Sequence, residues 1–143
     1  MNRIIKFRGQ RTDTKEWVYG YYFRNIHGNI FIINITSIKN GLSLWVKETE
    51  FFLGGMIEVI PETVGQYTGK KDKNDKEIYE KDIIQTDKSE GWADPKPNIV
   101  KWDKEQAGFY PFINKLDEMY TGEFEKEVIK VIGNIYKNPE LLK

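Results

Sequence analysis

The chain has 143 residues, of which 39% are hydrophobic and 14% aromatic, enough for one compact domain or two small subdomains. It contains no cysteine and one histidine, which excludes disulfide frameworks, zinc clusters and thiol catalysis. The 22 basic and 22 acidic residues balance, so the total charge gives no reason to expect a nucleic acid or an anionic membrane as partner. No apolar run is long enough for a membrane span, and we expect a soluble, cytoplasmic protein.

The charge is unevenly distributed along the chain. Residues 1–60 carry eight basic and five acidic groups, 8 − 5 = +3, and residues 61–143 carry fourteen and seventeen, 14 − 17 = −3. The two excesses allow either complementary packing of two parts of the chain or contact between the basic end and an acidic partner.

β-Branched and aromatic residues dominate the composition, which favours strands over long helices. In the first half, apolar runs bounded by turn residues predict five strands. In one of them Trp17, Tyr19, Tyr21 and Phe23 share a face, and another is apolar on both faces and is expected to be central. The predicted strands are Ile4–Arg8, Glu16–Phe23, Ile30–Ile35 (the central one), Leu42–Val46 and Met56–Ile60.

Pro61 marks the expected junction between an N-terminal β-rich region, 1–60, and a second region, 61–138. The polar stretch Gly69–Lys76 is typical of a hairpin tip, where Asn74 and Asp75 tolerate positive φ. Pro139–Leu142 predicts a terminal helical turn, so the fold class is mainly β with little helix. The strands predicted in this region are Val64–Thr68, Glu77–Ile84, Asn98–Trp102, Gly108–Phe112 and Val128–Asn134.

Basic residues interleaved with aromatic ones near the N-terminus are the sharpest binding signal. Grooves for single-stranded nucleic acid use this pattern, because bases stack on rings while cations meet phosphates. The same pattern has a structural explanation: rings at period two line small β cores, and cations on an edge strand discourage unwanted pairing with other strands. We favour this structural explanation over nucleic-acid binding. The candidate nucleic-acid-binding residues are Arg3, Lys6, Arg8, Arg11, Lys15, Trp17 and Tyr19.

Acidic residues of the second region raise the question of a metal site. Asp72–Asp75 resembles a calcium loop, but the glycine and the glutamate that an EF-hand loop requires are absent. Charged residues scattered along strands usually form the solvated face, so we expect no metal, no cofactor and no catalytic residue. The carboxylates weighed for a magnesium site are Glu77, Glu80, Asp82 and Asp87.

Seven segments carry a further pattern along nearly the whole chain: Ile5–Gly9, Trp17–Tyr21, Val64–Gly69, Asp72–Asn74, Lys76–Glu80, Asp82–Ile84 and Val131–Tyr136. In this order they closely resemble the YopX family of phage and prophage proteins, from about residue 4 to residue 142. The resemblance implies a β-rich fold that contains a small SH3-like β-barrel in the second region. It implies no catalytic residues, because the molecular function of the family is unassigned.

The motifs of the resemblance look architectural. Glycines permit sharp bends or close packing, and tyrosines bury ring area. Many relatives have glycine where this chain has Asp75 and Lys81; aspartate tolerates a left-handed conformation, whereas Lys81 argues against a tight turn at Glu80–Lys81. The motif residues are Gly20, Gly65, Tyr67, Gly69, Tyr79, Asp82, Gly133 and Asn134.

The resemblance and the missing catalytic groups predict a non-enzymatic accessory protein of a phage or prophage, acting as a binding or assembly module in the cytosol of a bacterial host. A nucleic-acid-binding protein is the alternative, and a carboxylate-dependent metal enzyme is a second one. The expected partner is an unidentified protein or a second copy of the chain, since leftover strand edges often pair. Nucleic acid is not the favoured partner, and no membrane contact is expected.

Overall fold

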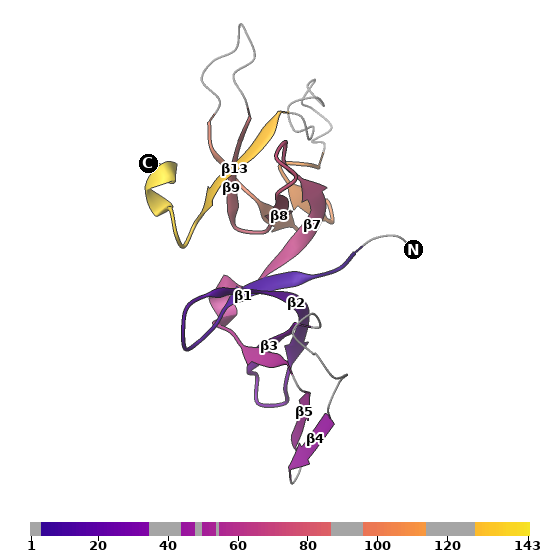
Figure 1. The fold of residues 1–143 in the computed structure, drawn as a ribbon. Helices are drawn as coiled ribbons and strands as arrows, with labels where there is room; N and C mark the ends of the chain where they lie inside the picture. The colour runs from indigo at the N-terminus through magenta and orange to yellow at the C-terminus, as the bar shows by residue number, and fades with distance from the viewer. Residues whose placement is uncertain (1–3, 35–43, 48–49, 54, 87–95, 114–127) are drawn as a thin grey trace, which may run out of the picture. The chain divides into compact units, whose positions relative to one another are not determined.

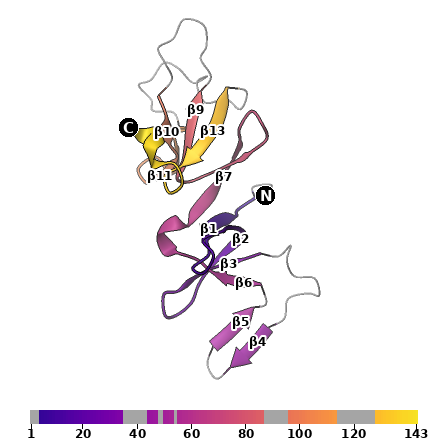
Figure 2. The same ribbon diagram turned by 60° about the vertical axis from the view of Figure 1, so that its left-hand side comes forward.

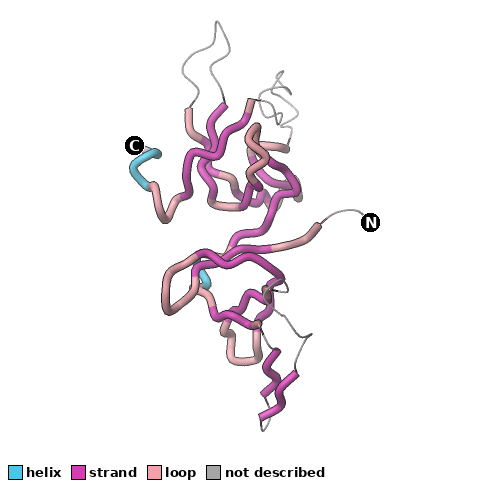
Figure 3. Tube along the Cα trace, in the orientation of Figure 1, coloured by secondary structure: helices cyan, strands magenta, loops and turns pink. Residues whose placement is uncertain are grey.

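The computed structural model describes residues 4–34, 44–47, 50–53, 55–86, 96–113 and 128–143. Antiparallel strands dominate these residues, and the described helices are the short 3-10 helices η2 (Pro61–Thr63) and η3 (Pro139–Leu142), which confirms the mainly β class (Figure 3). No helix in the described part of the chain is long and apolar enough to cross a membrane.

The chain divides into two compact units, residues 1–66 and 67–143. The boundary lies inside strand β7 (Gly65–Lys71), whereas Pro61, the expected junction, begins η2 within the first unit. Gly65 and Gln66 pair with the first strand of the chain, and the later residues of β7 pair with the strand that follows it.

The first unit contains an antiparallel sheet in which the strands follow the order β6-β3-β2-β1-β7. The central position expected for the strand that is apolar on both faces is confirmed, because β3 pairs with β2 on one side and β6 on the other, and its Ile32 is fully buried. A separate hairpin joins β4 to β5. The bounds are β1 (Phe7–Gln10), β2 (Trp17–Arg24), β3 (Ile30–Ile33), β4 (Leu44–Lys47), β5 (Glu50–Leu53) and β6 (Met56–Glu58) (Figure 1).

Two features of this unit differ from the prediction. Gly9 does not end the first strand but pairs with Val18 inside it. The position favours glycine, because a side chain there would meet Val59 at 3.0 Å. The strand β5 occupies a stretch in which the sequence predicted none.

The described residues of the second unit form four short antiparallel strand pairings. β7 pairs with β8, β9 lies between β10 and β13, and β11 pairs with β12 (Figures 1 and 2). The bounds are β8 (Glu77–Tyr79), β9 (Asp82–Thr86), β10 (Asn98–Ile99), β11 (Lys101–Asp103), β12 (Gly108–Tyr110) and β13 (Ile129–Asn134).

A tight turn at Glu80–Lys81 separates β8 from β9, so the expectation that lysine argues against this turn is wrong. Lys81 adopts a left-handed conformation with φ of 70°. The turn is held from both sides, because the Lys81 N–H donates to the carbonyl of Val100 at 2.7 Å and the Tyr79 N–H donates to the carboxylate of Asp82 at 2.9 Å.

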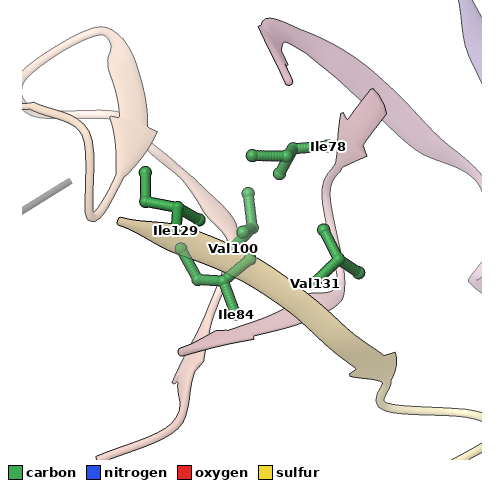
Figure 4. Packing of buried hydrophobic residues seen from close by; sticks show 5 residues of the cluster. All are labelled: Ile78, Ile84, Val100, Ile129 and Val131. Atoms are coloured by element: carbon green, nitrogen blue, oxygen red, sulfur yellow. The ribbon is translucent and has the colours of Figure 1, made fainter. Parts of the chain in front are cut away.

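Five buried aliphatic side chains from β8, β9, β13 and the residue between β10 and β11 form the core of the second unit (Figure 4). Although these segments lie far apart in the sequence, their side chains gather at one place because each strand turns one face inward. The cluster consists of Ile78, Ile84, Val100, Ile129 and Val131.

The sheets of the described residues are open and do not close into a barrel. The SH3-like barrel expected over 61–138 is therefore not confirmed. Strands of only two to seven residues in this unit form several short pairings instead of one sheet that curves back on itself.

Candidate binding surface

The aromatic side chains of β2 lie on two faces of the sheet. Strand alternation places Trp17, Tyr19, Tyr21 and Phe23 on one side, which we call the tyrosine face, and Tyr22 on the other. Tyr19 and Tyr21 are 46% and 51% exposed, so the expected packing of these two rings in a core is wrong. Alternation predicted which rings share a face, but it did not show whether that face is covered.

The far side of β2 is the packed one. Gly20 lies there, and a side chain at this position would collide with the backbone carbonyl of Ile33. Tyr22 is also 40% exposed, but its ring lies 5.4 Å from that of Phe7. Tyr19 and Tyr21 are therefore the exposed part of the tyrosine face, whereas Ile32, opposite Tyr22 in the register, is fully buried on the other side of the sheet.

Arg8 supports the tyrosine face from the neighbouring strand. It lies opposite Tyr19 in the β1–β2 register, and its guanidinium carbon is 4.7 Å from the centre of the Trp17 ring. A guanidinium stacked on an indole gains cation–π attraction that grows as water is removed, and Arg8 is only 5% exposed. The structure thus brings Arg8, Trp17 and Tyr19 together, but Arg8 positions Trp17 and offers little charge to solvent.

The other predicted cations that the structure describes lie outside strands β1 and β2. Lys6 is half-buried just before β1, and Arg3 lies outside the described residues. Lys15 is exposed in the β1–β2 loop, where its ammonium donates to the carbonyl of Thr12 at 3.0 Å. Of the predicted cations in the described residues, only Arg8 therefore lies within β1 or β2.

Arg11 is neutralised within its own loop. Its Nε and one terminal nitrogen donate to the two carboxylate oxygens of Asp13 at 2.8 and 2.7 Å. These two charge-assisted hydrogen bonds from Arg11 hold the pKa of Asp13 well below its usual range, and the same partner raises the pKa of Arg11. A phosphate would have to compete with this carboxylate for the guanidinium.

Two aromatic residues that are not on the list of binding candidates, Tyr21 and Phe23, extend the tyrosine face, although Tyr21 belongs to the basic and aromatic pattern that suggested it. Tyr21 lies opposite Ile33, and the ring of Phe23 lies 6.4 Å from that of Phe31 on β3. The period-two pattern already placed Tyr21 and Phe23 with Trp17 and Tyr19, so the signal for them was present in the sequence.

Two of the carboxylates weighed for a metal site accept hydrogen bonds from Tyr79. Asp82 is buried and accepts the Tyr79 N–H, Glu77 accepts the Tyr79 hydroxyl at 2.8 Å, and Asp87 lies outside the described residues. In the described part of the chain, no three or more histidine, aspartate or glutamate side chains lie close enough together to hold a metal ion. The Asp82 carboxylate therefore stabilises the turn between β8 and β9.

The motif residues contribute to the architecture of each unit. Tyr67 and Tyr79 are buried with their rings 5.5 Å apart, and the side-chain oxygen of Asn134 accepts the N–H groups of Tyr136 and Lys137 at 3.1 and 3.0 Å. Gly65 pairs with Arg8 in the sheet, Gly69 adopts a φ of 86°, and a side chain at Gly133 would overlap that of Asn138.

Comparison with known proteins gives a family and a fold. The sequence model described as YopX protein matches residues 6–143 of this chain. No curated protein matches. Among solved structures, the crystal structure of protein EF1440 from Enterococcus faecalis is similar with a TM-score of 0.52 and 23% sequence identity, over 99% of this chain and 100% of that one. At this identity the likeness concerns the fold alone.

Proposed function

The chain belongs to the YopX family, and on this premise we propose that it is a non-enzymatic accessory protein of a phage or prophage that binds single-stranded nucleic acid in the host cytosol. The proposed contact is the tyrosine face of the first unit. The observation that carries the proposal is the exposure of two tyrosine rings, Tyr19 and Tyr21, on one side of one strand.

The spacing of the two rings suits a row of bases. Residues two apart in a strand are separated by about 6.6 Å, since each residue advances the strand by roughly 3.3 Å. Exposed aromatic rings on an antiparallel sheet are a common platform for unpaired bases, because every base has a flat π-face that stacks without regard to sequence. Tyr19 and Tyr21 can each receive one base, while Arg8 keeps Trp17 in place beside them.

A role without catalysis is supported by how the described carboxylates are used. Asp82 accepts a backbone N–H, and the buried Asp72 accepts three. Carboxylates held in this way stabilise turns and are poorly placed for acid–base or metal chemistry.

The proposal is tested with a fluorescently labelled oligothymidylate, whose bases are unpaired, at about 50 mM salt. Replacing both Tyr19 and Tyr21 by alanine should weaken binding by roughly tenfold for each ring lost, since stacking on an aromatic side chain contributes about 1–3 kcal/mol per base. Tyr22→Ala is the matched control, because Tyr22 has similar exposure on the opposite face, and it should leave the affinity within about twofold.

Three results would contradict the proposal. One is a wild-type protein that does not bind the oligonucleotide, and another is an equal loss on Tyr22→Ala. The third is that the wild-type protein binds no oligonucleotide but self-associates, as measured by light scattering at two concentrations, and that the Tyr19 and Tyr21 variant does not self-associate. The tyrosine face would then contact a second copy of the chain.

A further inference from the structure

The second unit gathers lysines that are dispersed in the sequence. Lys71 ends β7, Lys73 and Lys76 lie in the connection to β8, and Lys130 lies on β13; all four side chains are exposed. We call these four residues the lysine cluster. Because residues 61–143 carry an excess of acidic groups, the charge count gave no sign of it.

Backbone hydrogen bonds bring the two segments together. The Lys73 N–H donates to the carbonyl of Ile129 at 3.0 Å, and the Val131 N–H donates to the Asp72 carboxylate at 3.0 Å. These bonds attach the hairpin connection to the residues on both sides of Lys130, so Lys73 and Lys130 belong to neighbouring segments.

The hairpin connection is held in one conformation. Oδ1 of Asp72 accepts the N–H groups of Asn74 and Lys76 at 2.8 and 3.0 Å, and Asp75 adopts the left-handed conformation with φ of 61° that the sequence predicted for this tip. The backbone beneath the lysines is therefore fixed, although each ammonium stands on a flexible stem.

The acids of the hairpin offset only part of this charge. Asp72 is 0% exposed and directs its carboxylate to backbone N–H groups, so its charge is withdrawn from the surface. Among the described residues 71–77 and 129–134, two other carboxylates remain, at the tip (Asp75, exposed) and opposite Lys71 (Glu77, half-buried). The residue opposite Lys130 is the neutral Gln85. Four lysines against two acids leave 4 − 2 = +2 at this place.

We propose that the lysine cluster is a second contact for nucleic acid, one that binds the phosphate backbone. The ligand class rests on the proposed function, whereas the cluster itself rests on the contacts described above. Lysine ammonium groups attract phosphates as point charges, and this attraction does not depend on the base sequence. Stacking of bases on aromatic rings is also independent of sequence, so the two kinds of contact are compatible in one nucleic-acid-binding protein. Beside the tyrosine face Arg8 is buried and Lys6 is half-buried, and in the adjoining loop Arg11 is bound to Asp13.

The test compares two double variants of the full chain that remove the same charge. Lys73→Gln with Lys130→Gln alters the cluster, and Lys104→Gln with Lys137→Gln alters exposed lysines of the same unit outside it. Affinity for the labelled oligothymidylate is measured from about 50 to 200 mM salt. Each phosphate contact to a single strand contributes roughly 0.7 to the slope of log affinity against log salt, so the loss of two contacts in the cluster variant should flatten this slope by about 1.4. The control should change the slope by less than about 0.3.

The outcomes separate this inference from the proposed function. An unchanged slope in the cluster variant, or an equal change in the control, overturns the inference, and the proposed function stands if Tyr19 and Tyr21 still matter. If the tyrosine variant binds like the wild type while the cluster variant alone loses affinity and slope, the lysine cluster is supported and the tyrosine face is not the contact. A wild-type protein that binds no oligonucleotide overturns both. Circular dichroism of every variant checks that the exposed substitutions leave the fold intact.

Discussion

The backbone N–H of Val131 donates a hydrogen bond of 3.0 Å to the carboxylate of Asp72, and this bond is buried. Oδ1 of the same side chain accepts two N–H groups of its own hairpin connection, those of Asn74 and Lys76. One side chain therefore both shapes a local turn and attaches that turn to β13. The loop that superficially resembled a calcium site in the sequence uses its first carboxylate for this purpose.

Removing this carboxylate should destabilise the protein. Asp72→Ala leaves the buried Val131 N–H without an acceptor and removes two further hydrogen bonds, and we expect a loss of about 3 kcal/mol in the free energy of unfolding. Urea denaturation measures it, with Glu105→Ala as the control at an exposed position of the same unit. A loss for Asp72→Ala no larger than for the control would contradict the role given to Asp72.

Lys81 offers a test of backbone strain. Because a left-handed conformation costs a non-glycine residue about 1–2 kcal/mol, Lys81→Gly should give a more stable protein than Lys81→Ala by roughly 1 kcal/mol. Both variants remove the contact between the Lys81 ammonium and the Tyr136 ring, so the comparison isolates the backbone. Thermal unfolding checks the order, and an alanine variant as stable as the glycine variant would show that φ at this position is not strained.

Two glycines should respond to alanine for different reasons. Gly20→Ala pushes a methyl group against the Ile33 carbonyl in the middle of the first sheet, and we expect a loss of more than about 2 kcal/mol, as for an overpacked site. Gly69→Ala meets open space and carries only the cost of its φ of 86°, about 1–2 kcal/mol. Chemical denaturation of both variants would contradict this distinction if Gly69→Ala proved the more damaging.

The Arg11–Asp13 pair predicts a specific titration. Because Arg11 lowers the pKa of folded Asp13 below its unfolded value, the pair contributes stability above the unfolded pKa, and this contribution is lost as pH falls toward the folded pKa. In an NMR titration the Asp13 carboxyl should titrate well below about 3.9, and Arg11→Gln should return its midpoint toward that value. Equal midpoints in the two proteins would mean that the pair does not persist in solution. Added salt should also weaken the shift, because both side chains are accessible to solvent.

Local patterns in the sequence determined much of the secondary structure. β-Branched and aromatic runs between glycines and prolines predicted β2, β3, β7 and β13 to within a few residues, and the polar stretch before Glu77 predicted a hairpin tip with positive φ at Asp75. These features depend on neighbouring residues, through steric preferences and side-chain alternation, so one sequence suffices to read them.

Tertiary structure decided which of these patterns lie exposed and which side chains meet. Period two grouped Tyr19 with Tyr21, but it could not show that both rings are exposed. Charge counting placed Arg11 in a basic cluster, but two hydrogen bonds to Asp13 neutralise its charge. The same counting could not show that Lys130 lies on the strand segment to which the Lys73 backbone is hydrogen-bonded. The strands also form open sheets where a barrel was expected. Burial, ion pairing and sheet closure depend on which distant segments meet, and that is set by the packing of the whole unit and not by the order of residues within a strand.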